Sequence, residues 1–139
     1  MGLTLKIIVP EKIAFERKVT SVILPTLMGE IEVLEGHLPI IGLLEPGTVF
    51  YKENGTITPL AIDTGFFKLR GTELVLLVEG AIDVRVLDDS SIDAAVRRAQ
   101  EELEKAKQEK AIDADELERL DKMLRFQVAQ KLTKHVKRS

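Results

Sequence analysis

Apolar residues in the first part of the chain fall in short runs that are separated by turn residues. Residues 30–34, Glu-Ile-Glu-Val-Leu, alternate charged and apolar side chains, as on a strand with one buried face. Asn54-Gly55 lies between two β-like runs, residues 49–52 and 56–58, which is a strong signal of a two-residue hairpin turn. Short strands at this spacing, without helices between them, are typical of a sandwich or a barrel. We predict a β-sandwich of about ten short strands.

The pattern changes near Asp88. All 9 Gly and all 5 Pro precede this residue, and the remainder is rich in Ala, Glu, Lys, Arg and Leu, which favour helices. Two stripes with helical spacing follow: Ile92, Ala95, Val96, Ala99, Leu103 and Ala106, and then Leu117, Leu120, Leu124, Val128 and Leu132. We therefore predict a sandwich over residues 1–87 and an antiparallel two-helix hairpin over residues 88–139.

Each predicted helix has a candidate capping sequence at its start. Ser90 with Asp93 would cap the first helix, and Asp113 with Glu116 would cap the second. The stripes are narrow, so the hairpin is expected to bury little apolar surface and to be only modestly stable alone.

Composition excludes several classes of function. The net charge of -3 lacks the basic excess of a nucleic-acid-binding protein. There is no Cys, which removes disulfides, zinc–thiolate sites and thiol nucleophiles. No run of about 18 apolar residues predicts a membrane span, so we expect any membrane association to go through a partner.

Candidate catalytic chemistry is sparse. His37 and His135 have no second strong ligand at metal-binding spacing, and no phosphate-binding loop motif is present. Asp88-Asp89 is interpreted as a capping or linker feature. We therefore expect no catalytic residue and no metal site. The remaining conspicuous feature is the segment from Gly29 to Pro39, either an ordinary turn or a rigid docking loop.

This segment resembles the epsilon subunits of F-type ATP synthases. Gly29-Glu30-Ile31, Leu34 and Gly36-His37-x-Pro39 are similar to a characteristic string of that family. Leu44-x-Pro46-Gly47 and Thr64-Gly65-Phe66-Phe67-x-Leu69 resemble its following turn and strand. The resemblance extends over essentially the whole chain.

The resemblance implies a non-catalytic subunit of the central stalk, peripheral to the energy-coupling membrane, on its cytoplasmic face in a bacterium. Its sandwich would bind the gamma subunit and the c-ring, with Met28, Gly29 and Glu30 near the c-ring and His37 near the gamma–c-ring junction. The hairpin would fold against the sandwich or extend to the alpha and beta subunits and restrain ATP hydrolysis. Candidate inhibitory residues are Arg119, Lys122, Arg125, Lys131 and Lys134.

The sequence departs from family members that bind ATP at the first helix. Those members carry an [IL]-D-x-x-R-A motif, whereas here Ile92-Asp93 is followed by Val96 and then by Arg97 and Arg98. A shift of one residue turns a side chain by about 100° around a helix. Asp93 and Arg97 are the candidate nucleotide ligands, but we expect that no cofactor is required and that ATP is not sensed.

Two simpler interpretations stay open. The basic end of the second helix, which includes Lys131, Lys134, Lys137 and Arg138, can complement the helix dipole or dock on an acidic partner. The chain can also be a free-standing adaptor, with the sandwich as a binding module and the hairpin as a dock for a partner helix.

Overall fold

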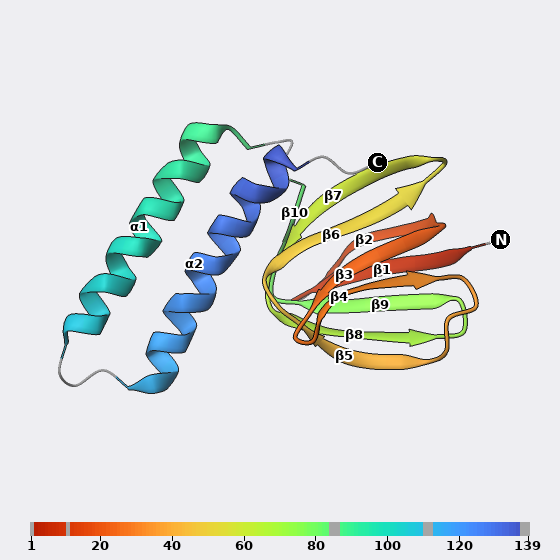
Figure 1. The fold of residues 1–139 in the computed structure, drawn as a ribbon, viewed down its shortest axis with the longest axis horizontal. Helices are drawn as coiled ribbons and strands as arrows, with labels where there is room; N and C mark the ends of the chain where they lie inside the picture. Colours follow the sequence, from red (N-terminus) through yellow and green to blue (C-terminus); the bar gives the residue numbers. More distant parts are fainter. Residues whose placement is uncertain (1, 11, 84–86, 110–112, 137–139) are drawn as a thin grey trace.

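The computed structural model describes residues 2–10, 12–83, 87–109 and 113–136 and contains ten strands and two helices (Figure 1). The strands are β1 (Leu3–Val9), β2 (Lys12–Val19), β3 (Ser21–Thr26), β4 (Gly29–Leu34), β5 (Ile40–Leu44), β6 (Gly47–Glu53), β7 (Thr56–Ile62), β8 (Gly65–Arg70), β9 (Glu73–Val78) and β10 (Ala81–Ile82). The helices are α1 (Asp89–Gln108) and α2 (Ala114–His135). The prediction of a ten-strand β unit followed by two helices is confirmed.

The strands hydrogen-bond in the order β10-β7-β6-β3-β5-β8-β9-β1-β2, and β4 pairs with β3. Neighbours are antiparallel except for β1 and β9, which run parallel. This sheet folds over on itself, so that β2 approaches β6. There Phe15 and Tyr51 pack with ring centroids 5.1 Å apart, and Arg17 forms an ion pair with Glu53 at 3.5 Å. These contacts hold the two layers together at their edges.

The core between the layers consists mainly of Val, Ile and Leu, as the low aromatic content predicts. The largest fully buried side chain is that of Phe67. The alternation predicted for residues 30–34 is also present, because Ile31 and Val33 turn toward the core while their charged neighbours are exposed. Asn54 and Gly55 both have positive φ, 51° and 80°, which confirms the predicted hairpin turn.

The two helix starts differ in how well the sequence predicts them. Asp113 caps α2 by accepting a hydrogen bond from the Glu116 N–H at 2.8 Å, as predicted. For α1 the prediction of Ser90 is wrong, because Asp88 is the cap. Its Oδ1 accepts from the Ser91 N–H at 2.7 Å and from the Ser90 hydroxyl at 2.8 Å. The hydrogen bond from Ser91 is the main reason that the pKa of Asp88 lies below its ordinary value.

Helix α2 lies between α1 and the sandwich, where it packs on β6 and β7 (Figure 1). Leu103 and Ala106 of α1 pack against Leu120 of α2, with Leu117 and Leu124 beside them, which confirms both stripes over this stretch. The hairpin is therefore in its folded position in this structure.

The predicted stripe of α2 is wrong at its end. The Leu132 side chain is 63% exposed, whereas Ala129 and Thr133 are buried. The Thr133 hydroxyl hydrogen-bonds the Thr48 hydroxyl of β6 at 2.6 Å. The reason is that α2 has neighbours on two sides, and small side chains on the sheet side let the helix approach β6 closely.

Candidate protein-binding surfaces

An apolar row crosses the outer face of five adjacent strands. In the strand register, Leu43 of β5 is opposite Phe66 of β8, which is opposite Leu77 of β9, then Ile8 of β1 and Ile13 of β2. We call these five residues the apolar band. Since successive side chains of a strand point to opposite faces, the band points away from the core that their neighbours fill. Leu43, Phe66 and Ile13 are exposed, and Ile8 and Leu77 are half-buried.

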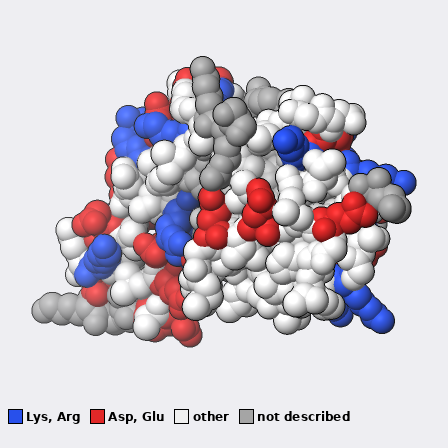
Figure 2. Space-filling model, turned by 45° about the vertical axis from the view of Figure 1, so that its right-hand side comes forward, with Lys and Arg blue, Asp and Glu red and all other residues white. Residues whose placement is uncertain are grey.

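The apolar band continues into the turn between β3 and β4. The Leu27 N–H donates to the Leu43 carbonyl at 3.1 Å, which places this turn beside the end of the band. Leu27, Met28, Ile41 and Leu43 line a hollow of about 310 Å³ there, and the Met28 side chain is 92% exposed. In the space-filling view, the lower part of the sandwich, where Figure 1 draws β5 and β8, is largely uncharged (Figure 2).

Two glycines let the strands under this surface pack closely. A Cβ on Gly65 would lie 2.0 Å from the Leu77 carbonyl oxygen, so β8 can pair with β9 at this distance only without a side chain there. A Cβ on Gly42 would lie 2.7 Å from the Phe67 ring, which forms part of the floor of the hollow. The Thr64-Gly65-Phe66-Phe67 motif thus combines a tight strand contact, one outward ring and one core ring.

The residues predicted to face the c-ring and gamma subunit lie at the two ends of β4. Met28, Gly29 and Glu30 are exposed at its start, and His37 is exposed in the connection that follows it. The His37 N–H donates to the Leu34 carbonyl at 3.1 Å, and its Nδ1 lies 2.7 Å from the Leu38 carbonyl. A strand of six residues separates the two groups by about 17–20 Å. The structure therefore does not gather them into one site, and their roles stay predictions.

The five basic residues predicted to inhibit hydrolysis all lie on α2, and each contacts a carboxylate of this chain. Two of them pair within the helix. Arg119 donates two hydrogen bonds to Glu116, at 3.0 and 2.5 Å, and this contact lowers the pKa of Glu116 and raises that of Arg119. Lys122 lies 3.5 Å from Glu118.

The other three reach carboxylates outside α2. Arg125 Nη1 lies 2.7 Å from Glu45 Oε2 in the loop between β5 and β6; the contact is an ion pair whose angles do not meet those of a hydrogen bond. Lys131 Nζ lies 2.9 Å from Asp93 Oδ1, and Lys134 Nζ lies 3.6 Å from Asp89 Oδ1. Lys137 and Arg138, also predicted to form the basic end, lie outside the described residues.

The two candidate nucleotide ligands are on α1. Asp93 is engaged by Lys131, and Arg97 is exposed on the same helix. Asp93 therefore ties α1 to α2 in this conformation. The expectation that ATP is not sensed stays a prediction.

Within the described ranges, no group of three or more His, Asp or Glu side chains is placed to hold a metal ion. Neither α1 nor α2, as far as the structure describes them, is long and apolar enough to cross a lipid bilayer.

The sequence prediction missed the apolar band, although a signal for it exists. A strand with one wet face alternates apolar and polar residues, as residues 30–34 do. Residues 73–78, Glu-Leu-Val-Leu-Leu-Val, and 40–44, Ile-Ile-Gly-Leu-Leu, are apolar on both faces. That pattern indicates strands that are covered on both sides, and it marks β5 and β9.

A large apolar surface on an otherwise charged protein is characteristic of a subunit that binds other proteins. Comparison with known proteins gives the family. Residues 2–84 match the model of the ATP synthase delta/epsilon chain β-sandwich domain. The plastid ATP synthase epsilon chain of Prototheca wickerhamii is 32% identical over 95% of this chain and 98% of its own length. The chain belongs to the ATP synthase epsilon family, which confirms the resemblance found in the sequence.

Solved structures show the same fold. A chain of the Euglena gracilis mitochondrial ATP synthase, in a structure of OSCP, F1 and c-ring, superimposes with a TM-score of 0.76 at 18% identity, covering 96% of this chain and 82% of that one. A chain of the Tetrahymena thermophila mitochondrial ATP synthase central stalk and c-ring gives a TM-score of 0.59 at 12% identity, covering 94% and 97%.

Proposed function

We propose that this subunit is a non-catalytic part of the ATP synthase central stalk that links the gamma subunit to the c-ring. The exposed apolar band on the sandwich is the observation that carries the proposal. Exposure of apolar side chains to water is unfavourable in free energy, and burial of this surface against a partner removes that penalty. The two structural neighbours belong to assemblies that contain the c-ring, in one case together with the central stalk, which supports such a position.

The apolar band and the β3–β4 turn would bind two different partners. The band lies flat across five strands, which suits a broad contact with the gamma subunit. Met28 projects from the adjoining turn and, with Gly29 and Glu30, would meet the polar loops of the c-ring. His37, at the other end of β4, would then contact a different part of the stalk. Through these contacts the subunit would be peripheral to the energy-coupling membrane.

The hairpin supplies the regulatory part of the proposal. In an extended position, Arg119, Lys122, Arg125, Lys131 and Lys134 of α2 would meet acidic segments of the alpha and beta subunits and restrain ATP hydrolysis. The folded position would keep Arg125, Lys131 and Lys134 from those segments, because each pairs there with a carboxylate outside α2. Arg119 and Lys122 pair within α2 and keep those partners in either position. No cofactor is needed for either position.

Co-purification tests this function with a matched pair of variants. Leu43→Asp places a charge in the apolar band, and Leu132→Asp places the same charge on α2, at side chains that are 58% and 63% exposed. Tagged full-length chain should recover the gamma subunit and the c-ring in near-stoichiometric amounts. Leu43→Asp should lose the gamma subunit, and Leu132→Asp should retain it.

Absence of both the gamma subunit and the c-ring from the unmodified sample would refute the stalk function and favour a free-standing adaptor. Equal recovery with both variants would show that the apolar band is not the gamma-binding surface. Circular dichroism of each variant checks that the sandwich is folded.

A further inference from the structure

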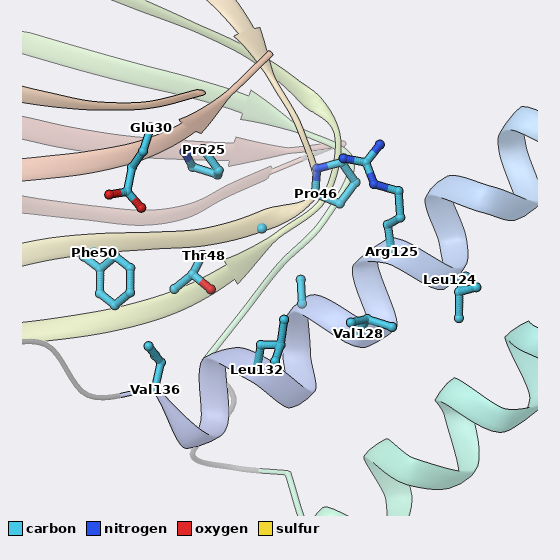
Figure 3. A pocket seen from close by; sticks show the side chains of 12 residues that line it. Pro25, Glu30, Pro46, Thr48, Phe50, Leu124, Arg125, Val128, Leu132 and Val136 are labelled. Carbon is cyan, nitrogen blue, oxygen red and sulfur yellow. The ribbon is translucent and has the colours of Figure 1, made fainter. Parts of the chain in front are cut away.

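The contact between α2 and the sandwich is incomplete on its apolar side. A groove of about 590 Å³ lies between the helix and β3 and β6, bordered by Pro25, Phe50, Val128 and Leu132 among others (Figure 3). Small residues such as Ala129 supply the buried contact next to it. Since apolar burial is limited here, polar contacts must provide a larger share of what holds the hairpin in place.

One such contact joins α2 to the sandwich. In Figure 3, Arg125 extends from the helix toward Pro46, which lies between β5 and β6. Its guanidinium forms an ion pair with Glu45, the residue before Pro46. The Glu45 side chain is only 24% exposed, and its Oε2 is buried. Burying a carboxylate without a counter-charge is unfavourable in free energy. Loss of the Arg125 contact would leave Glu45 in that state until its side chain becomes solvated, and this opposes the departure of α2 from the sandwich.

Further contacts join the end of α2 to the beginning of α1. Lys131 meets Asp93, and Lys134 meets Asp89, whose Oδ1 also lies 3.2 Å from His135 Nε2. The Lys134 Nζ in addition donates a hydrogen bond to the Leu87 carbonyl, just before α1. The acidic first turns of α1 thus hold the basic last turns of α2.

We propose that Glu45, Asp89 and Asp93 form an intramolecular substitute for an acidic partner surface and keep the hairpin closed by occupying Arg125, Lys131 and Lys134. In the closed chain these three cations face carboxylates of the same molecule, so binding of a partner through them competes with closure. Naming the partner as the catalytic subunits rests on the proposed function. The closure itself does not.

The chain offers a matched comparison. Glu45→Gln/Asp89→Asn/Asp93→Asn removes the three carboxylates that hold α2 from outside. Glu104→Gln/Glu116→Gln/Glu118→Gln removes three that pair within one helix, with Lys107, Arg119 and Lys122. Both variants lose three negative charges and the ion pairs of three Lys or Arg side chains, and the first also loses the contact between Asp89 and His135. They differ in whether those pairs cross between elements.

Opening is measured by the reaction rate of a buried thiol, because the chain has no Cys. Ala129→Cys reports separation of α2 from the sandwich, and Ala106→Cys reports separation of α1 from α2. The two positions are equally buried, since Ala129 and Ala106 are each 6% exposed. When closing is fast, the labelling rate is proportional to the open fraction, even where that fraction is small.

Each exposed ion pair changes an equilibrium by roughly twofold to fivefold, so the first triple variant should speed labelling by about tenfold or more at one or both positions. The control triple variant should change it by less than about threefold. Equal rates in the two triple variants would overturn the proposal. Far-UV circular dichroism shows whether the helices are retained in each.

A second measurement, the rate of ATP hydrolysis, distinguishes failure of this inference from failure of the proposed function. In assembled ATP synthase, the Glu45→Gln/Asp89→Asn/Asp93→Asn variant should hydrolyse ATP more slowly than the unmodified subunit, because Arg125, Lys131 and Lys134 are released to the partner. Faster labelling with unchanged hydrolysis would support closure by the three carboxylates and refute the inhibitory role of α2. Unchanged labelling would refute the closure, whatever hydrolysis does.

Discussion

Gly65→Ala and Gly71→Ala form a pair of identical substitutions that the structure expects to differ strongly in cost. A Cβ on Gly65 would meet three backbone atoms of β9: the Leu77 carbonyl oxygen at 2.0 Å, the Val78 Cα at 2.7 Å and the Leu77 carbonyl carbon at 2.9 Å. Gly65 and Val78 are opposite each other in the β8–β9 ladder. Backbone cannot move away here without breaking that pairing.

Gly71 is the opposite case. It lies in the turn between β8 and β9 with φ of 62°, and an added Cβ would meet no atom within 4 Å. The cost is therefore conformational only, roughly 1–2 kcal/mol for a left-handed residue. Part of it is offset because Ala also restricts the unfolded chain by about 0.4–1 kcal/mol relative to Gly. The net loss in the free energy of unfolding should be about 1 kcal/mol.

A methyl group forced against packed backbone should lower the free energy of unfolding by about 3 kcal/mol or more. This is at or above the upper end of the loss that results when a side chain is enlarged in a well-packed core. For a unit the size of the sandwich, each kcal/mol lowers the melting temperature by about 4–8 °C. Gly65→Ala should therefore lose roughly 12–24 °C and Gly71→Ala about 4–8 °C.

Thermal unfolding followed by circular dichroism in the β-sheet region measures both values on the full chain. Equal melting temperatures, or a larger loss for Gly71→Ala, would refute the close approach of β8 to β9. A Gly65→Ala chain that does not fold agrees with the expectation, and Gly71→Ala then remains as the measurable member of the pair.

Three further predictions concern the hairpin. The folded-state pKa of Asp88 is lowered below 3.8. Its stabilising contribution as a helix cap is therefore complete above the unfolded-state pKa and is lost as pH falls through the folded-state pKa. Circular dichroism on acidification should show a loss of helix, and Asp88→Ala should shift the pH at which that loss occurs. Isothermal titration calorimetry should detect no sub-millimolar ATP binding, since Asp93 is paired with Lys131; measurable binding would refute that interpretation. Deleting residues 92–139 should leave assembly intact and raise ATP hydrolysis, and unchanged hydrolysis would place inhibition elsewhere.

Local patterns predicted most of the fold. Alternation along residues 30–34, the Asn54-Gly55 turn and the change of composition at Asp88 each depend on residues near in sequence. They predicted a strand, a hairpin and the helical part, all of which the structure contains. The capping error at Ser90 has a local cause as well, because Asp88, Ser90 and Ser91 all favour the start of a helix and only geometry selects one.

The site was harder to predict because its contacts are distant in sequence. The apolar band exists only through the order β5-β8-β9-β1-β2, which places Leu43 beside Phe66 and Ile8 beside Leu77. Helical periodicity likewise predicted that Leu132 is buried, since it gives an apolar face but not the neighbour that covers it. The pairing of Arg125 with Glu45, 80 positions apart, has no signal in either local pattern.

A photo-crosslinker on one introduced cysteine would test most directly that the apolar band binds the gamma subunit. The chain has no other Cys, so Phe66→Cys and Lys52→Cys each carry a single label, the first in the band and the second exposed on β6 in the other layer. In assembled ATP synthase, we predict that Phe66→Cys forms an adduct with the gamma subunit and that Lys52→Cys does not. No gamma adduct from Phe66→Cys, or equal yields from both positions, would contradict this account.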